Sequence, residues 1–171
     1  MSLIYLAHGA SGSAASMAPH VAGLRARGFE AFAVQLPRGR AEAAIAAYRS
    51  AAAPSPDAAI GGQSFGGRVA SLLAADEPYG ALILLSYPLH PPGSSERWDE
   101  RTAHWPRIAG PVLLLSGDRD PFARLDLLRK AVKRLPAAQL VVYPGIGHGL
   151  GPVLDPALDE VAGFIRSIRT E

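Results

Sequence analysis

One serine of this chain lies within a cluster of glycines. Gly62-Gln63-Ser64-Phe65-Gly66 has the form G-x-S-x-G, in which a serine sits on a sharp turn between a strand and a helix. An apolar run at 58–63 precedes the motif, and apolar residues at helical spacing follow it, which is the context the motif requires. Glycines two before and two after the serine would let other backbone approach closely. The pattern predicts Ser64 as a nucleophile.

A phosphate-binding loop is the main alternative for the same glycines. Gly61 and Gly66 have the G-x-x-x-x-G spacing of such a loop. The next two residues should then be lysine and a hydroxyl residue, but they are Gly67 and Arg68. The loop at 9–13 also lacks G-x-G-x-x-G, the dinucleotide-binding pattern. The glycines therefore favour a serine nucleophile over a nucleotide site.

A serine nucleophile needs a base, and the base needs a carboxylate to orient it. His148 lies between two glycines after the last predicted strand, and Asp118 and Asp120 follow the apolar run VLLLS. We expect Asp120 to be the carboxylate and Asp118 to form the turn, with the opposite assignment left open. The remaining histidines are weaker candidates for the base: His8, His20, His90 and His104.

The oxyanion of an acyl-transfer intermediate is usually held by two backbone N–H groups. One comes from the residue after the nucleophile and the other from a loop after an early strand. These would be Phe65 and Ala10 in this chain. We expect the nearby His8 to support the loop by a hydrogen bond rather than to transfer a proton.

Apolar strand-like runs alternate with amphipathic helical runs along the whole chain. This alternation predicts a parallel sheet with right-handed crossovers, and thus one α/β domain over residues 1–171 with three layers, α/β/α. The predicted sheet is mostly parallel, with about six strands, at residues 3–7, 29–34, 58–63, 81–86, 112–116 and 140–143. Predicted helices lie at 17–28, 41–53, 69–75, 125–135 and 158–168. Such sheets carry their sites at the carboxyl ends of the strands, where Ser64, Asp120 and His148 would meet.

Residues 87–110 interrupt this rhythm with a proline-rich polar excursion that carries both tryptophans, Trp98 and Trp105. The excursion is too short for a large lid, so we expect an open pocket. The expected substrate-binding residues are Ser11, Tyr87, Leu89 and Leu150, beside Phe65. The tryptophans would wall this pocket, or pack the excursion onto the sheet, or form an exposed apolar surface for a partner.

Composition excludes several classes of protein. The chain has no cysteine, so disulfides and thiolate sites are absent, and its formal net charge of +2 gives no field that would recruit nucleic acid. No H-E-x-x-H pair is present, so we expect no metal and no cofactor. The N-terminus reads as a strand rather than a signal peptide, and no apolar run is long enough for a membrane span. We therefore expect a cytoplasmic protein without membrane contact; its oligomeric state is not readable.

These motifs together resemble those of the α/β-hydrolase superfamily. Within it, the chain looks like the small, dienelactone-hydrolase-related members grouped with the KANL3/Tex30-like domain. The matching stretches are LAHGASGS, GGQSFGGRVAS, SYPLHPPG, SGDRDPF and GIGHGL. The chain departs from the superfamily in starting at what would be its third strand and in having no large lid.

The resemblance implies a Ser64, Asp120 and His148 triad that cleaves a small carboxylic ester or thioester through an acyl-enzyme. Two alternatives remain open. The chain could be a non-catalytic interaction domain with the same fold, or an acyltransferase or peptidase that uses the same triad.

Overall fold

The computed structural model describes residues 3–168 of the chain. A six-stranded sheet forms its centre, in the order β2-β1-β3-β4-β5-β6. Every neighbouring pair of strands is parallel, as the βαβ alternation predicts. The strands are β1 (Leu3–Ala7), β2 (Glu30–Val34), β3 (Ser55–Gln63), β4 (Tyr79–Leu85), β5 (Val112–Gly117) and β6 (Ala138–Tyr143).

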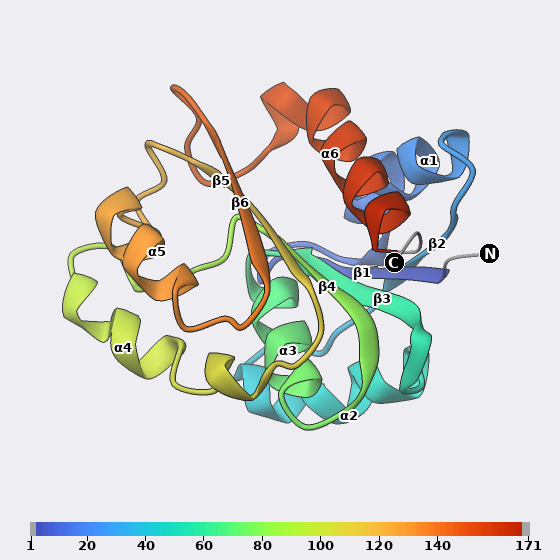
Figure 1. The fold of residues 1–171 in the computed structure, drawn as a ribbon, viewed down its shortest axis with the longest axis horizontal. Coiled ribbons are helices and arrows are strands. Elements are labelled where there is room, and N and C mark those ends of the chain that lie inside the picture. The colour runs from blue at the N-terminus through green and yellow to red at the C-terminus, as the bar shows by residue number, and fades with distance from the viewer. Residues whose placement is uncertain (1–2, 169–171) are drawn as a thin grey trace.

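Helices cover both faces of the sheet, which confirms the predicted three-layer α/β architecture (Figure 1). One face carries α1 (Ala18–Ala26) and α6 (Leu154–Ser167), and their apolar residues share one buried cluster. The other face carries α2 (Ala41–Ala51), α3 (Phe65–Ala74) and α5 (Leu125–Val132), which share a second cluster. The short α4 (Trp98–Arg101) packs beside α5.

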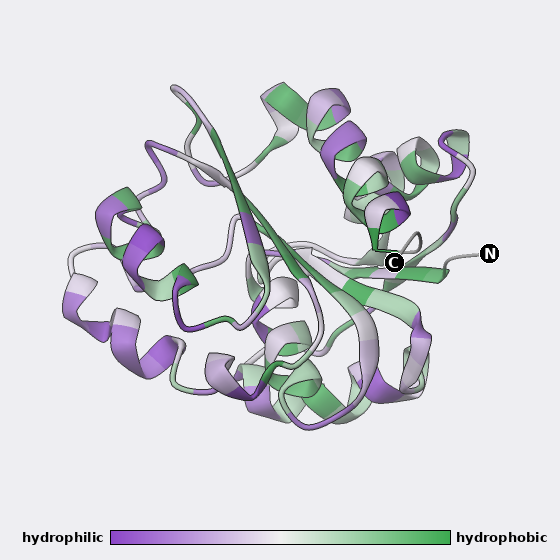
Figure 2. Cartoon of the chain, in the orientation of Figure 1, coloured by the Kyte–Doolittle hydropathy of each residue, from purple (hydrophilic) through white to green (hydrophobic). Residues whose placement is uncertain are grey.

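The central strands are apolar on both faces because each face packs against a helical layer. In β4, Leu82 and Leu84 belong to the cluster under α2, α3 and α5, whereas Ile83 belongs to the cluster under α1 and α6. All three are almost completely buried. Hydrophobic residues accordingly follow the sheet, while hydrophilic residues lie on the outer sides of the helices (Figure 2).

A buried tyrosine links two strands at the centre of the sheet. The Tyr48 side chain comes from α2, and its hydroxyl accepts a hydrogen bond from the Gly61 N–H at 2.9 Å. The same hydroxyl lies 2.7 Å from the carbonyl oxygen of Gly61 and 2.9 Å from that of Tyr5. Burial raises the pKa of Tyr48, so the hydroxyl keeps its proton. It therefore joins β1 to β3 just before the G-x-S-x-G turn.

No large lid is inserted after β4 in the described chain, as expected. The connection between β4 and β5 contains only η2 (Ser95–Arg97), α4 and η3 (Trp105–Arg107). Trp105 within it is completely buried against Tyr87. Trp98 is partly buried, with the Arg134 guanidinium 4.3 Å and the Lys130 ammonium 5.1 Å from its ring. The alternative of an exposed tryptophan surface is therefore wrong, because the tryptophans pack the excursion onto the domain.

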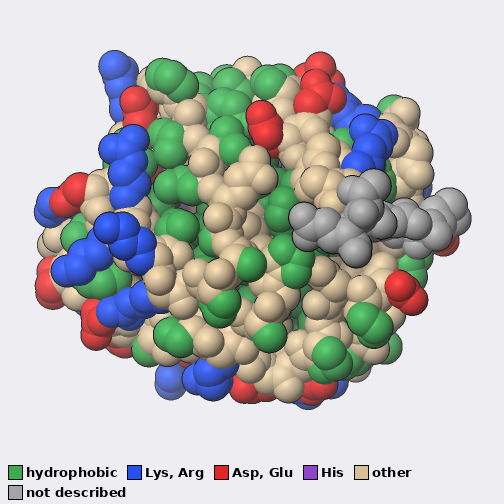
Figure 3. Space-filling view, in the orientation of Figure 1, with side chains coloured by type: hydrophobic (Ala, Val, Ile, Leu, Met, Phe, Trp, Pro, Cys, Tyr) green, Lys and Arg blue, Asp and Glu red, His purple; other side chains and the backbone are tan. Residues whose placement is uncertain are grey.

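On the face seen in Figure 3, basic and acidic side chains are interspersed around the edge, and the middle is mostly apolar or uncharged. Between residues 3 and 168, no helix has the length and apolarity that crossing a membrane requires.

Candidate active site

Ser64 occupies a strained turn between β3 and α3. Its backbone has φ 48° and ψ −111°, a conformation that a residue with a side chain adopts only at a cost of about 1–3 kcal/mol. Two hydrogen bonds hold it. The Ser64 N–H donates to the Leu85 carbonyl of β4 at 2.8 Å, and the Ser64 carbonyl accepts from the Arg68 N–H at 3.0 Å. The neighbouring strand and the first turn of α3 thus fix the serine together.

The glycines around Ser64 are required by close backbone contacts. A Cβ on Gly62 or on Gly66 would lie 2.4 Å from the carbonyl oxygen of Ala7 in β1. A Cβ on Gly67 would lie 2.9 Å from the Gly62 carbonyl. One on Gly61 would lie 2.0 Å from the Ile83 carbonyl of β4, which is a role that the sequence did not indicate. Each of these backbone atoms would have to move to admit a side chain.

The three residues expected to form a triad lie in one hydrogen-bonded chain. Ser64 Oγ is 2.8 Å from His148 Nε2. His148 Nδ1 is 2.8 Å from Asp120 Oδ2 and 2.9 Å from Asp120 Oδ1. With the imidazole neutral, Nδ1–H donates to the carboxylate and Nε2 accepts from the serine hydroxyl. The Asp120 side chain is fully buried and that of His148 is 21% exposed.

The two aspartates after β5 do different things. Asp120 points to His148, and its Oδ1 also accepts a hydrogen bond from the Phe122 N–H at 2.8 Å. Asp118 instead accepts a hydrogen bond from the Gly145 N–H at 2.7 Å and so joins the loops after β5 and β6. The structure therefore places Asp120 in the hydrogen-bonded chain and Asp118 in the turn.

Two further residues have roles at this site that the sequence did not indicate. Phe122 lies against the His148 ring, with ring centroids 4.3 Å apart. His90 is buried, and its Nε2 accepts from the Arg124 N–H at 3.1 Å while its backbone N–H donates to the Phe122 carbonyl at 2.9 Å. His90 thus anchors the loop that carries Asp120 and Phe122. From the sequence, His90 was only a weaker candidate for the base, and the SYPLHPPG stretch that contains it did not indicate this contact.

The two expected oxyanion donors both line the cavity in front of Ser64. Phe65 is the first residue of α3, where a backbone N–H has no acceptor within the helix. Among residues 3–168, no backbone hydrogen bond from the Ala10 N–H is found. The His8 Nδ1–H donates to the Gly9 carbonyl at 2.7 Å, and its Nε2 accepts from the Leu36 N–H at 3.0 Å. His8 therefore supports the loop that carries Ala10.

The cavity in front of Ser64 has a volume of about 410 Å³. Its walls come from the loop after β1, the start of α2, the first turn of α3, Pro88 and α4. Of the expected substrate-binding residues, Tyr87, Leu89 and Leu150 are at most 2% exposed and lie in the core, so this expectation is corrected. Ser11 is exposed on the surface and is not among the lining residues. Pro88 and Phe122 take the places expected of the buried residues.

The family described as alpha/beta hydrolase domain matches residues 34–156. That match covers most of the chain, so the protein belongs to the alpha/beta hydrolase domain family. In this chain, the hydrogen-bonded Ser64, His148 and Asp120 lie where the carboxyl ends of β3, β5 and β6 meet.

Solved structures share the whole fold at low sequence identity. A monoacylglycerol lipase from Paleococcus ferrophilus superposes with a TM-score of 0.81 at 15% identity, over 97% of this chain and 94% of that one. Est1E from Butyrivibrio proteoclasticus gives a TM-score of 0.77 at 20% identity, over 99% and 89% of the two chains. The thioesterase domain from the curacin biosynthetic pathway gives 0.75 at 16%, over 96% and 90%. The likeness at these identities shows the fold.

Proposed function

We propose that this protein is a serine hydrolase that cleaves carboxylic esters or thioesters through an acyl-enzyme. The observation that carries the proposal is the unbroken chain of contacts from Ser64 Oγ through His148 to the buried Asp120 carboxylate, beside an open cavity. Family membership and the fold shared with a lipase and a thioesterase domain also support it.

In the first half of the reaction, Ser64 Oγ attacks the acyl carbonyl carbon while His148 Nε2 accepts the hydroxyl proton. The negative charge that develops on the carbonyl oxygen is held by the N–H groups of Ala10 and Phe65. One such donor is typically worth about 3–4 kcal/mol in the transition state. His148 then donates the proton to the departing alcohol or thiol, and an ester of Ser64 remains.

In the second half, water enters as the nucleophile. His148 Nε2 accepts a proton from the water while the water oxygen attacks the acyl carbon. The proton then returns to Ser64 Oγ, and the carboxylic acid leaves. The Asp120 carboxylate keeps the proton of neutral His148 on Nδ1 and stabilises the imidazolium that forms in both halves.

The narrower resemblance to KANL3/Tex30-like hydrolases is part of this proposal. The SYPLHPPG stretch that carries it contains Pro88, which lines the cavity, and His90, which anchors the loop of Asp120. This stretch therefore belongs with the proposed site, although general triad chemistry does not require it.

The test is covalent labelling by a fluorophosphonate probe together with hydrolysis of short p-nitrophenyl esters. We expect the wild type to react with the probe at Ser64 and to release p-nitrophenol. The Ser64→Ala variant should do neither while keeping the wild-type circular dichroism spectrum. A folded wild-type protein that neither reacts with the probe nor cleaves any ester of the series would refute the proposal.

A further inference from the structure

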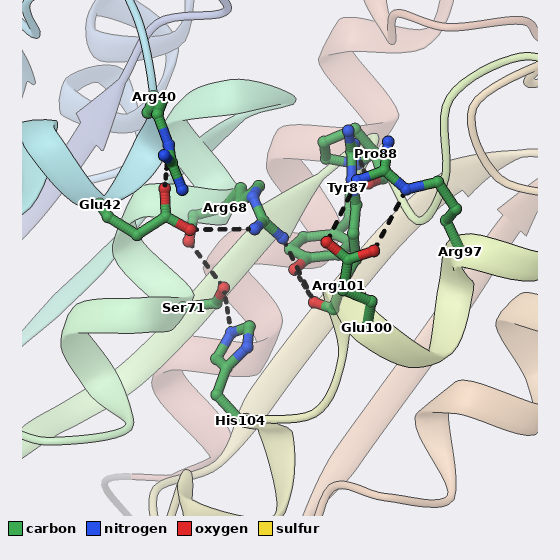
Figure 4. Close-up of polar contacts among 10 residues, drawn as sticks. All are labelled: Arg40, Glu42, Arg68, Ser71, Tyr87, Pro88, Arg97, Glu100, Arg101 and His104. Atoms are coloured by element: carbon green, nitrogen blue, oxygen red, sulfur yellow. Dashed lines mark hydrogen bonds and ion pairs between the residues drawn. The ribbon is translucent and has the colours of Figure 1, made fainter. Parts of the chain in front are cut away.

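The cavity in front of Ser64 is lined by an excess of cationic side chains. Four arginines and two glutamates contribute to its wall (Figure 4), namely Arg40, Arg68, Arg97, Arg101, Glu42 and Glu100. They come from three separate segments: the start of α2, the first turns of α3, and the excursion at η2 and α4. The fold therefore gathers positive charge at the mouth of the proposed active site, although the whole chain is close to neutral.

The two carboxylates do not neutralise this charge. Glu42 is shared between Arg40 at 3.7 Å and Arg68 at 3.5 Å, distances at the long end for an ion pair. Glu100 pairs with Arg97 at 3.1 Å. Within residues 3–168, no carboxylate oxygen lies within 4.0 Å of the Arg101 guanidinium. Arg101 thus has no anionic partner among these residues, and Arg68 has only the more distant carboxylate of Glu42.

Arg101 is held in place without such a partner. Its Nη1–H donates to the Pro88 carbonyl at 2.9 Å. Its own carbonyl accepts from the buried Tyr87 hydroxyl at 2.8 Å and faces the Arg68 Nη1 at 3.5 Å. Burial, and next the charge of Arg68, lower the pKa of Arg101, but a guanidinium keeps its proton near neutral pH. The Arg101 guanidinium is therefore oriented before any ligand binds, and the Arg68 guanidinium lies against the Arg101 backbone in the wall of the same cavity.

These cations lie within reach of a molecule bound to Ser64. Arg68 follows Ser64 by one helical turn, and its N–H donates to the Ser64 carbonyl. Only 18% of the Arg68 side chain is exposed, so its charge acts in a partly dehydrated environment where electrostatic attraction is stronger than in water. An ester whose carbonyl carbon meets Ser64 Oγ would place the rest of the molecule along the wall that contains Arg68 and Arg101.

We propose that the substrate is an ester or thioester that carries an anionic oxyacid group, a carboxylate or a phosphate, bound by Arg68 and Arg101. This inference rests on the proposed serine hydrolase activity and adds the substrate class. Guanidinium groups bind such oxyacids through paired hydrogen bonds. Because Arg101 is already oriented, little side-chain freedom is lost when the anion binds.

The test compares matched anionic and neutral esters. Mono-p-nitrophenyl adipate is compared with p-nitrophenyl hexanoate, which has the same leaving group and chain length. For phosphate on the leaving group, 4-(butyryloxy)phenyl phosphate is compared with phenyl butyrate. After correction for spontaneous hydrolysis, we expect kcat/KM of the wild type to favour the anionic member at least tenfold in one pair. The pair that shows the preference identifies the oxyacid.

Arginine variants then test the origin of the preference. In Arg101→Gln and Arg68→Gln, we expect the anionic-to-neutral ratio to fall by about tenfold to a hundredfold, mainly through KM of the anionic ester. Arg101→Lys should recover part of the ratio, because it restores charge without the planar fork. Arg107→Gln is the matched control, since Arg107 is in the same excursion but pairs with Asp76 outside the cavity. Added salt should reduce the wild-type preference.

The outcomes separate this inference from the proposed function. Cleavage of the neutral esters with no anionic preference in either pair overturns the inference and leaves the hydrolase proposal standing. A preference that survives both glutamine variants also overturns it. If no ester is cleaved and Ser64 is not labelled, calorimetry on Ser64→Ala with monomethyl adipate decides. Binding of monomethyl adipate to Ser64→Ala that disappears in the Ser64→Ala/Arg101→Gln double variant supports the anion site. No binding of this ester to Ser64→Ala refutes it.

Discussion

Two neighbouring strands of the sheet end in the same way, each on a serine with a positive φ. Ser64 after β3 has φ 48° and Ser86 after β4 has φ 51°. Each backbone N–H donates at 2.8 Å to a residue of the next strand, Ser64 to Leu85 and Ser86 to Leu115. At the level of the backbone, the two turns repeat each other one strand apart.

The segments after the two serines differ. Ser64 leads directly into α3 and contacts His148 through its hydroxyl. Ser86 is completely buried, leads into the proline-rich excursion, and has a hydroxyl with no hydrogen-bond partner among the described residues. A strained serine at a strand end is therefore not sufficient for a nucleophile. The glycines that admit the helix, and the loops that bring a base to the hydroxyl, make the difference.

The largest effect should be on catalysis and should come from Asp120. This carboxylate orients the base of Ser64, and Ser86 has neither a base nor a carboxylate among the described residues. In Asp120→Asn, we expect kcat for ester hydrolysis to fall by about 10⁴, because the amide favours the wrong tautomer of His148. Asp118→Asn should stay within about threefold of wild type, since the amide oxygen can still accept the Gly145 N–H. Steady-state kinetics of the two variants give the contrast, and equal losses would contradict the assignment of the aspartates.

The next largest effect should be on stability. It should come from the glycines that flank Ser64 and have no counterpart beside Ser86. Gly66→Ala should lower the free energy of unfolding by about 3 kcal/mol or more, because its Cβ would lie 2.4 Å from the Ala7 carbonyl. Gly147→Ala is the control, since nothing lies within 4 Å of a Cβ there. Urea unfolding of both variants measures the difference. Equal stabilities would show that the strand-to-helix turn can relax.

A smaller effect is expected from the segment after Ser86, which is held on α3 by a histidine. His104 Nε2 lies 2.8 Å from the Ser71 hydroxyl. Burial, and then the charges of Arg68 and Arg107, lower the pKa of His104 from 6.5 to about 4. The unfolded chain therefore binds a proton at a higher pH than the folded protein does. This contribution to stability is complete above pH 6.5 and is lost as the pH falls from 6.5 toward 4.

Between pH 7 and pH 4.5, we expect the free energy of unfolding of the wild type to fall by about 2 kcal/mol more than that of His104→Gln. This difference follows from the lowered pKa of His104. Urea unfolding at the two pH values measures it. Burial lowers the pKa of His20 too, and this contribution is common to both proteins, so it cancels in the comparison. Parallel pH profiles of the two proteins would exclude His104 as the source.

The smallest effect should come from Ser86 itself. In Ser86→Ala, we expect the free energy of unfolding to rise by about 1 kcal/mol, because a buried hydroxyl without a partner is removed. Ester hydrolysis should change less than threefold, in contrast to Ser64→Ala. Thermal unfolding and steady-state kinetics give both values. A loss of stability would instead mean that the hydroxyl of Ser86 has a bound partner.

The two serines also show how far the sequence could predict the molecule. The alternation of apolar runs was enough for the parallel sheet, and every predicted strand was found within a few residues of its place. The glycine pattern identified the turn at Ser64. Ser86 has no such pattern around it, so the sequence did not indicate its positive φ.

Errors are concentrated where tertiary packing overrides local pattern. Tyr87, Leu89 and Leu150 were expected to face the substrate. The excursion instead buries Tyr87 and Leu89 in one cluster of the core, and the loop after β6 buries Leu150 in the other. The arginines of the cavity come from three distant segments, so no local spacing could bring them together. Spacing after successive strands did indicate Asp120 and His148, because parallel topology sends those loops to one edge of the sheet.

The hydroxyl of Tyr48, between β1 and β3, has a consequence for the order of folding. It contacts Tyr5 and Gly61, residues that lie 43 positions before it and 13 after it in the chain. The two strands are therefore bridged at this position only when α2 has docked on the sheet. We expect Tyr48→Phe to slow folding rather than to speed unfolding, and stopped-flow kinetics that show the reverse would refute this. The backbone around the proposed nucleophile would then already be assembled in the folding transition state, as a single cooperative step of helix and strands.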